Sequence, residues 1–139
     1  MITSVFRQQH KALLELAAKM PAKVAAIHEA EVRAVLFKLT GALRVHLKLE
    51  DERLYPMLLA HSLKSVRDMA ARFQREMGGL LEAYNAFHAK WSVTGAVSSD
   101  PGKFLHHWAE IVNALGLRIG REDNELYALA DKVVDPPAA

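Results

Sequence analysis

The chain contains no cysteine, and it has few proline, glycine and aromatic residues. The absence of cysteine excludes disulfides, thiolate metal sites and cysteine nucleophiles. The shortage of proline and glycine leaves long stretches of Ala, Leu, Glu, Lys and Arg, which are strong helix formers. The sequence of 139 residues therefore predicts an all-α protein with enough chain to bury a core of its own.

Long apolar runs and clusters of charge of one sign are missing as well. No run approaches the length of a membrane span, and the N-terminus lacks the charged-then-apolar pattern of a signal peptide. The net charge is +2, and basic residues alternate with acidic ones, which does not favour nucleic-acid binding. We therefore expect residues 1–139 to form a single cytoplasmic domain with no membrane or nucleic-acid partner.

Apolar residues recur at steps of three and four in four segments, which predicts four amphipathic helices. The first segment leaves two alternatives open. Pro21 favours an end just before it, whereas the apolar stripe continues to Ile27 and favours a kinked helix. If His10 faces His46 in an antiparallel pair, the turn between the two helices falls near His28. We therefore expect the kink.

The other three helices have clearer signals at their ends. Proline and glycine clusters mark loops, and Ser is a common cap at a helix N-terminus. Short connections join antiparallel neighbours, so the fold predicted is an up-down-up-down antiparallel four-helix bundle. The second helix reaches Tyr55-Pro56, the third runs from a cap at Ser62 to Trp91, a loop spans Ser92 to Gly102, and the fourth ends before Asp135-Pro136-Pro137.

The chain also repeats itself imperfectly, as an internal repeat of residues 7–58 and 74–130. The segment from His46 to Tyr55 returns 72 positions later, with Arg118 in place of the histidine. The segment around His10 returns 67 positions later, with Met77 in place of the histidine. The second copy has therefore lost both imidazoles and kept its glutamate.

In the predicted bundle, the two histidines and the two glutamates of the repeat point into one region of the core. His10 and His46 share a layer with Met77 and Arg118, and the glutamates lie one turn further along two helices. Two buried carboxylates require a cation between them. Imidazole with carboxylate suits iron, manganese or zinc, and the Arg118 guanidinium is a second candidate cation. The candidate metal ligands are His10, His46, Glu50 and Glu122.

Over roughly residues 5 to 130, these motifs resemble the hemerythrin-like, HHE cation-binding domains. The resemblance is carried by the spacing of His10 to His46, by His-x-x-x-Glu with the following Leu54-Tyr55-Pro56, and by the later Arg-Glu-Asp-x-Glu-Leu-Tyr. It implies a bundle with two irons bridged by two carboxylates and held by histidines on all four helices. Carried over by position, His10 and His46 bind one iron, and Glu50 and Glu122 are the bridges.

The chain departs from that family pattern at Met77 and Arg118. A thioether is a weak ligand for iron and a guanidinium is none, so we expect one metal ion in place of two. We also expect the Arg118 head to occupy the second metal position. The ion is expected to be iron, with manganese or zinc as alternatives.

Three functions remain open at this point. The first is a metal-binding sensor or carrier that takes dioxygen, nitric oxide or peroxide at a single ion. The second is a metal-free regulatory or protein-interaction bundle in which Arg118 replaces the second metal. An oxidoreductase is the least favoured, because the sequence supplies no further catalytic constellation. Tyr55 and Tyr127 follow the two glutamates by five positions. A hydroxyl that reaches a carboxylate or ligand is one alternative, but we expect both residues to pack at the end of the bundle.

Overall fold

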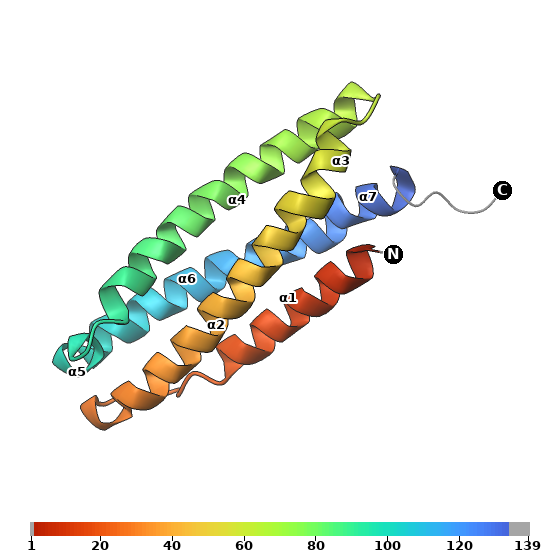
Figure 1. The fold of residues 1–139 in the computed structure, drawn as a ribbon. Helices are drawn as coiled ribbons and strands as arrows, with labels where there is room; N and C mark the ends of the chain where they lie inside the picture. The colour runs from red at the N-terminus through yellow and green to blue at the C-terminus, as the bar shows by residue number, and fades with distance from the viewer. Residues whose placement is uncertain (1, 134–139) are drawn as a thin grey trace.

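The computed structural model describes residues 2–133, and within that range all regular structure is helical, with no strand (Figure 1). The predicted stop at Asp135-Pro136-Pro137 lies outside the described residues. In chain order the elements are α1 (Ile2–Ala18), a 3-10 turn (Ala26–His28), α2 (Glu29–Leu49), a first π-helical turn (Glu50–Leu54), α3 (Tyr55–Leu59), α4 (Lys64–Trp91), α5 (Ala96–Ser99), α6 (Pro101–Arg121), a second π-helical turn (Glu122–Leu126) and α7 (Tyr127–Val133).

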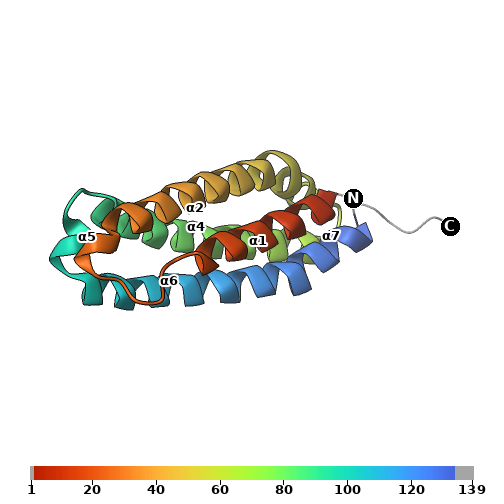
Figure 2. The same cartoon turned by 90° about the horizontal axis from the view of Figure 1, so that it is seen from below.

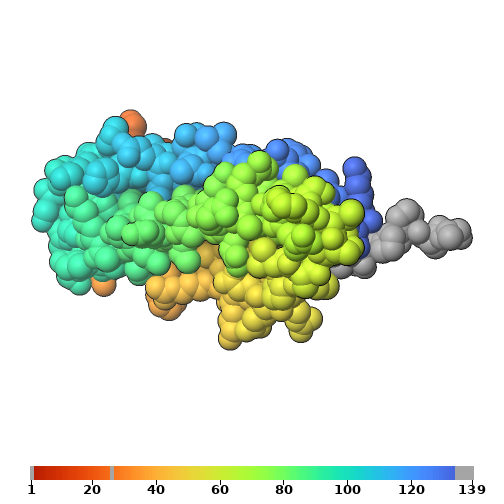
Figure 3. Space-filling model, turned by 90° about the horizontal axis from the view of Figure 1, so that it is seen from above, coloured from red at the N-terminus to blue at the C-terminus, as the bar shows by residue number. Residues whose placement is uncertain are grey.

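These elements form four antiparallel rods in up-down-up-down order, which confirms the predicted bundle. The first rod is α1, the second joins α2 to α3, the third is α4, and the fourth joins α6 to α7 (Figures 1 and 2). Each π-helical turn lies inside a rod, so both rods continue past it. On the face seen in Figure 3, α4 (green) runs between α6 (blue) on one side and α2 and α3 (orange to yellow) on the other.

The bundle core consists of two apolar clusters with a polar layer between them. One cluster extends toward α5 and includes Leu13, Leu43 and Leu115. The other lies around α3 and α7 and includes Phe6 and Leu54. Between them along the rods lie the buried polar side chains His10, His46, Glu50, Arg118 and Glu122. The apolar clusters therefore isolate these polar groups from bulk water on both sides.

The first helix ends earlier than predicted, and the kink through Pro21 is wrong. Helix α1 stops at Ala18, and the backbone N–H groups of Lys19 and Met20 close the end with bonds to carbonyls three residues back. Pro21 has no N–H to continue the ladder, and its ring blocks the preceding turn. Ile27, expected on the buried stripe, lies in the 3-10 turn and is 88% exposed.

The expected cap at Ser62 is also wrong, because α4 begins at Lys64 with Leu63 as the cap residue and no side-chain capping bond. Other groups satisfy the backbone there. Arg67 Nη1 donates to the Ser62 carbonyl at 2.8 Å, and the Leu63 N–H donates to His61 Nδ1 at 3.0 Å.

The loop between the third and fourth rods is more ordered than predicted, because it contains the short helix α5. Gly95 adopts a φ of 89° just before α5, a conformation that suits glycine. Asp100 then caps α6 by accepting a hydrogen bond from the Lys103 N–H at 3.1 Å, with Pro101 at the first helical position. Among residues 2–133, no helix is long and apolar enough to cross a membrane.

Candidate metal centre

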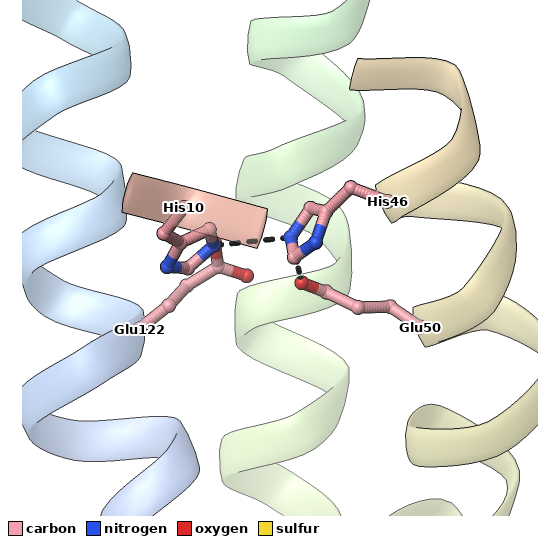
Figure 4. Close-up of side chains that lie close together, drawn as sticks. All are labelled: His10, His46, Glu50 and Glu122. Atoms are coloured by element: carbon pink, nitrogen blue, oxygen red, sulfur yellow. Dashed lines mark hydrogen bonds and ion pairs between the residues drawn. The ribbon is translucent and has the colours of Figure 1, made fainter. Parts of the chain in front are cut away.

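The fold brings together the four side chains that the sequence singled out. His10 comes from α1, His46 from α2, Glu50 from the start of the first π turn, and Glu122 from the start of the second (Figure 4). One nitrogen or oxygen of each residue lies within 4.8 Å of the corresponding atoms of the other three. All four side chains are buried. None of them comes from α4, so three of the four rods supply the cluster.

The atoms that meet at the centre are the Nε2 nitrogens and one oxygen of each carboxylate. The Nε2 atoms of His10 and His46 lie 3.0 Å apart. Glu50 Oε1 lies 2.5 Å from His46 Nε2, and Glu122 Oε1 lies 3.3 Å from His10 Nε2. Figure 4 shows both rings and both carboxylates converging on this region.

The opposite nitrogen of each ring faces an acceptor outside the centre. His10 Nδ1 donates to Asp123 Oδ1 at 2.9 Å, and His46 Nδ1 donates to Gln9 Oε1 at 2.7 Å. A neutral ring that donates through Nδ1 carries no proton on Nε2. In that tautomer both Nε2 lone pairs are directed at the centre. Metal-binding histidines are usually fixed by outer partners of this kind.

Without a cation, this arrangement brings lone pairs and carboxylate oxygens together in a buried space. Both oxygens of Glu122 and Oε2 of Glu50 are buried and have no hydrogen-bond partner. Burial raises the pKa of Glu122. Burial by itself lowers the pKa of His10, but the nearby carboxylates of Glu122 and Asp123 outweigh it and leave that pKa raised. The centre thus favours a positive charge between its imidazole nitrogens and carboxylate oxygens.

Tyr127 reaches the middle of the cluster. We expected it to pack at the bundle end, and its ring does pack against Phe6 with ring centroids 5.5 Å apart. Its hydroxyl, however, donates to Glu50 Oε1 at 2.5 Å and lies 3.1 Å from His10 Nε2 and 3.4 Å from His46 Nε2. Burial is the largest cause of a raised pKa of Tyr127, followed by the charges of Glu122 and Glu50, so the hydroxyl is a donor in this arrangement.

The π-helical turns explain why a residue five positions after each glutamate turns inward. The Tyr127 N–H bonds to the Glu122 carbonyl, and the Tyr55 N–H bonds to the Glu50 carbonyl, so each turn holds one extra residue. In such a turn the residues at i and i+5 lie on the same side, and π turns are frequent at functional sites. The Tyr55 hydroxyl is also buried, but it has no hydrogen-bond partner.

The Arg118 guanidinium pairs with groups on α4 outside the four candidate ligands. Its Nη1 pairs with Glu76 on α4, and its Nη2 donates to the Phe73 carbonyl at 2.8 Å. The guanidinium carbon lies 4.4 Å from the centre of the Phe73 ring. Glu76 also pairs with Arg121 at 2.7 Å. Arg118 therefore neutralises Glu76, and the described residues include no ion pair between Arg118 and either Glu50 or Glu122.

The family was then established by comparison with known proteins. The family model for the hemerythrin HHE cation-binding domain matches residues 1–130. The chain belongs to the hemerythrin family. A search of curated proteins and a search of solved structures found no significant match.

This member of the hemerythrin family carries a buried group of two histidines and two glutamates that could hold a cation. The donor set fits that role, since imidazole and carboxylate together suit iron, manganese or zinc. The contacts of Gln9 and Asp123 with this group were not predicted from the sequence, and the contact of Tyr127 was the less favoured alternative. Each has a simple sequence signal: Gln9 and Asp123 are direct neighbours of His10 and Glu122, and Tyr127 repeats the five-residue offset of Tyr55.

Proposed function

We propose that this protein binds one non-haem iron-type ion through His10, His46, Glu50 and Glu122, and that it acts as a sensor or carrier. The ion would be iron, with manganese or zinc as alternatives. An iron-type ion would supply redox chemistry and open positions for dioxygen, nitric oxide or peroxide. In this proposal the protein residues hold the ion and exclude bulk water, and both imidazoles bind the ion in their neutral form.

The observation that carries the proposal is the pair of Nε2 atoms facing each other while both Nδ1 positions are hydrogen-bonded to acceptors. Two neutral rings of this tautomer repel each other at 3.0 Å unless a cation lies between them. The unpartnered oxygens of Glu50 and Glu122 at the same place support a cation as well.

A single ion is favoured over two by the residues on the other side of the centre. Met77 and Arg118 stand where the family resemblance implies histidines, and Arg118 is engaged with Glu76 and Phe73. Neither residue offers a ligand that iron prefers.

The second candidate is a metal-free regulatory or protein-interaction bundle. One observation favours it. Arg118 is buried and its Nε has no hydrogen-bond partner, so the core already contains a positive charge without any metal ion. The pairing of Arg118 with Glu76 weakens this candidate, because it leaves the charges of Glu50 and Glu122 without a guanidinium partner.

The deciding experiment is the metal content per chain, measured by plasma mass spectrometry on untagged protein purified without added metal or chelator. We expect about one equivalent of iron, manganese or zinc, and none in His46→Ala. His106→Ala is the matched control, since His106 forms an exposed i,i+4 pair with Glu110 just as His46 does with Glu50 in the core.

Each result selects one of the candidates. About one equivalent in the wild type and in His106→Ala, with loss in His46→Ala, supports the single-ion centre. Protein without metal favours the interaction bundle. About two equivalents would mean that residues other than those at positions 77 and 118 complete a second metal position.

A further inference from the structure

The Tyr127 hydroxyl lies among the candidate ligand atoms, whereas packing in the core involves only its ring. Its oxygen is within 3.4 Å of three donor atoms, Glu50 Oε1, His10 Nε2 and His46 Nε2. The side chain is fully buried, and its ring lies against the His10 ring with centroids 5.2 Å apart. An ion that contacts these three donor atoms therefore has the phenol oxygen within reach.

We propose that Tyr127 is a fifth ligand of the bound ion when that ion is ferric iron. This inference rests on the proposed function, because it requires a metal ion at His10, His46, Glu50 and Glu122. It adds an oxygen ligand from α7 that the resemblance to the family does not imply.

Charge balance supports a phenolate ligand for the ferric ion in particular. Buried charges are tolerated when they are compensated locally. Glu50 and Glu122 balance a divalent ion, whereas a ferric ion leaves one positive charge that the Tyr127 phenolate would cancel. The charge of Arg118 is already met by Glu76, and Asp123 is one-third exposed, so solvent offsets its charge.

The proton balance of this step is simple. The proton that Tyr127 donates to Glu50 is released to solvent as the ferric ion binds, because metal ligands must be deprotonated and metal binding releases protons. With a divalent ion such as zinc, Tyr127 keeps its proton and remains a hydrogen-bond donor to Glu50.

Tyr55 provides a matched control within the same chain. It follows Glu50 by five residues at the end of the first π turn, as Tyr127 follows Glu122 at the end of the second. Its hydroxyl is buried like that of Tyr127, but it makes no hydrogen bond with the four candidate ligands.

The test is the visible absorption spectrum of protein loaded with ferric citrate, with the iron content measured on the same sample. We expect a broad phenolate-to-iron charge-transfer band in the wild type and in Tyr55→Phe, and loss of the band in Tyr127→Phe. Resonance Raman scattering of the wild type, excited in that band, should show enhanced phenolate ring modes. This second measurement needs no variant, so it holds even if Tyr127→Phe folds poorly.

The outcomes separate this inference from the proposed function. Iron-loaded wild type without the band, or a band that survives in Tyr127→Phe, overturns Tyr127 as a ligand and leaves the single-ion centre standing. Loss of the band in Tyr55→Phe alone would assign the ligand to Tyr55 and overturn the proposal as well. Protein that takes up no iron contradicts the proposed function and, with it, the role of Tyr127.

Discussion

The Nε2 atoms of His10 and His46 lie 3.0 Å apart, while the Nδ1 atom of each ring donates to an acceptor. We infer that the centre requires a cation between the two rings. A proton can satisfy one such contact, whereas a metal ion can satisfy both nitrogens and the nearby carboxylates together. The predictions below follow from this requirement and from the separate pairing of Arg118 with Glu76.

Removal of metal should lower the stability of the fold. Without an ion, both oxygens of Glu122 and Oε2 of Glu50 stay buried without a hydrogen-bond partner, which destabilises the folded chain. By mass action, free metal at 100 times its dissociation constant stabilises the folded state by about 2.7 kcal/mol. Thermal unfolding with excess zinc or iron, compared with excess chelator, measures this difference. A midpoint that does not respond to either condition would support the metal-free bundle.

Asp123→Ala should weaken metal binding while leaving the fold intact. The substitution removes the acceptor that holds the His10 ring with its Nε2 directed at the centre. Loss of such an outer partner lowers metal affinity by about 10- to 100-fold. Competition with a chromophoric chelator measures the affinity. Glu125→Ala, in the same π turn but paired only with Arg121 in the described part of the chain, is the control and should bind metal as the wild type does.

Glu76→Gln should destabilise the bundle, because Arg118 is buried and this carboxylate is its ion-pair partner. Glu76 itself is 38% exposed, so solvent screening limits the loss to about 1 kcal/mol. Urea unfolding measures the change in free energy. The exposed pair of Arg121 with Glu125 offers a comparison, since Glu125→Gln should have a smaller effect. Equal effects of the two substitutions would contradict a special role for the Arg118 pair.

The ion pair between Arg118 and Glu76 predicts that the stability of the fold depends on pH. The hydrogen bond from Arg118 is the main reason that the pKa of Glu76 lies below its ordinary value of 4.5. A lowered pKa in the folded state contributes stability that is complete above the ordinary value and is lost as the pH falls through the folded-state pKa. The difference between wild type and Glu76→Gln should therefore be largest near neutral pH and shrink below pH 4.5. Urea unfolding at several pH values checks this, and a difference that grows in acid would reverse the assigned sign.

Restoring imidazoles in the second half should add a metal ion. The double variant Met77→His with Arg118→His places ligands where the internal repeat lacks them, and it also removes the guanidinium. We expect the metal content to rise by about one equivalent over the wild type. The matched control is Met77→Ala with Arg118→Ala, which removes the same side chains without supplying ligands. If the metal content of the histidine variant is unchanged, the absence of histidine at these two positions is not the reason that the second metal ion is missing.

Much of the fold was predictable because helical periodicity is a local property. Apolar residues at steps of three and four located the four rods, and the all-α antiparallel bundle is confirmed. The error at Pro21 arose where two local signals conflicted. The apolar stripe suggested that the helix continues to Ile27, but the missing N–H of the proline decided the end.

The side chains of the candidate centre were also predictable, although not their contacts. The imperfect repeat singled out His10, His46, Glu50 and Glu122, and the structure places their donor atoms together. The partner of Arg118 could not be predicted from the repeat, because Glu76 lies on a different helix. A small rotation of either helix decides which carboxylate the guanidinium meets.

The order and types of the amino acids were enough to establish the helical class, the family resemblance and the residue types available for a metal. Composition, periodicity and spacing act along the chain, so they can be recognised without its three-dimensional path. The three-dimensional packing was needed to show that both imidazoles are held by outer acceptors, that a π turn begins at each glutamate, and that Tyr127 points into the centre. These features depend on the packing of helices far apart in the sequence, where a shift of one residue in a turn changes which side chain faces the core.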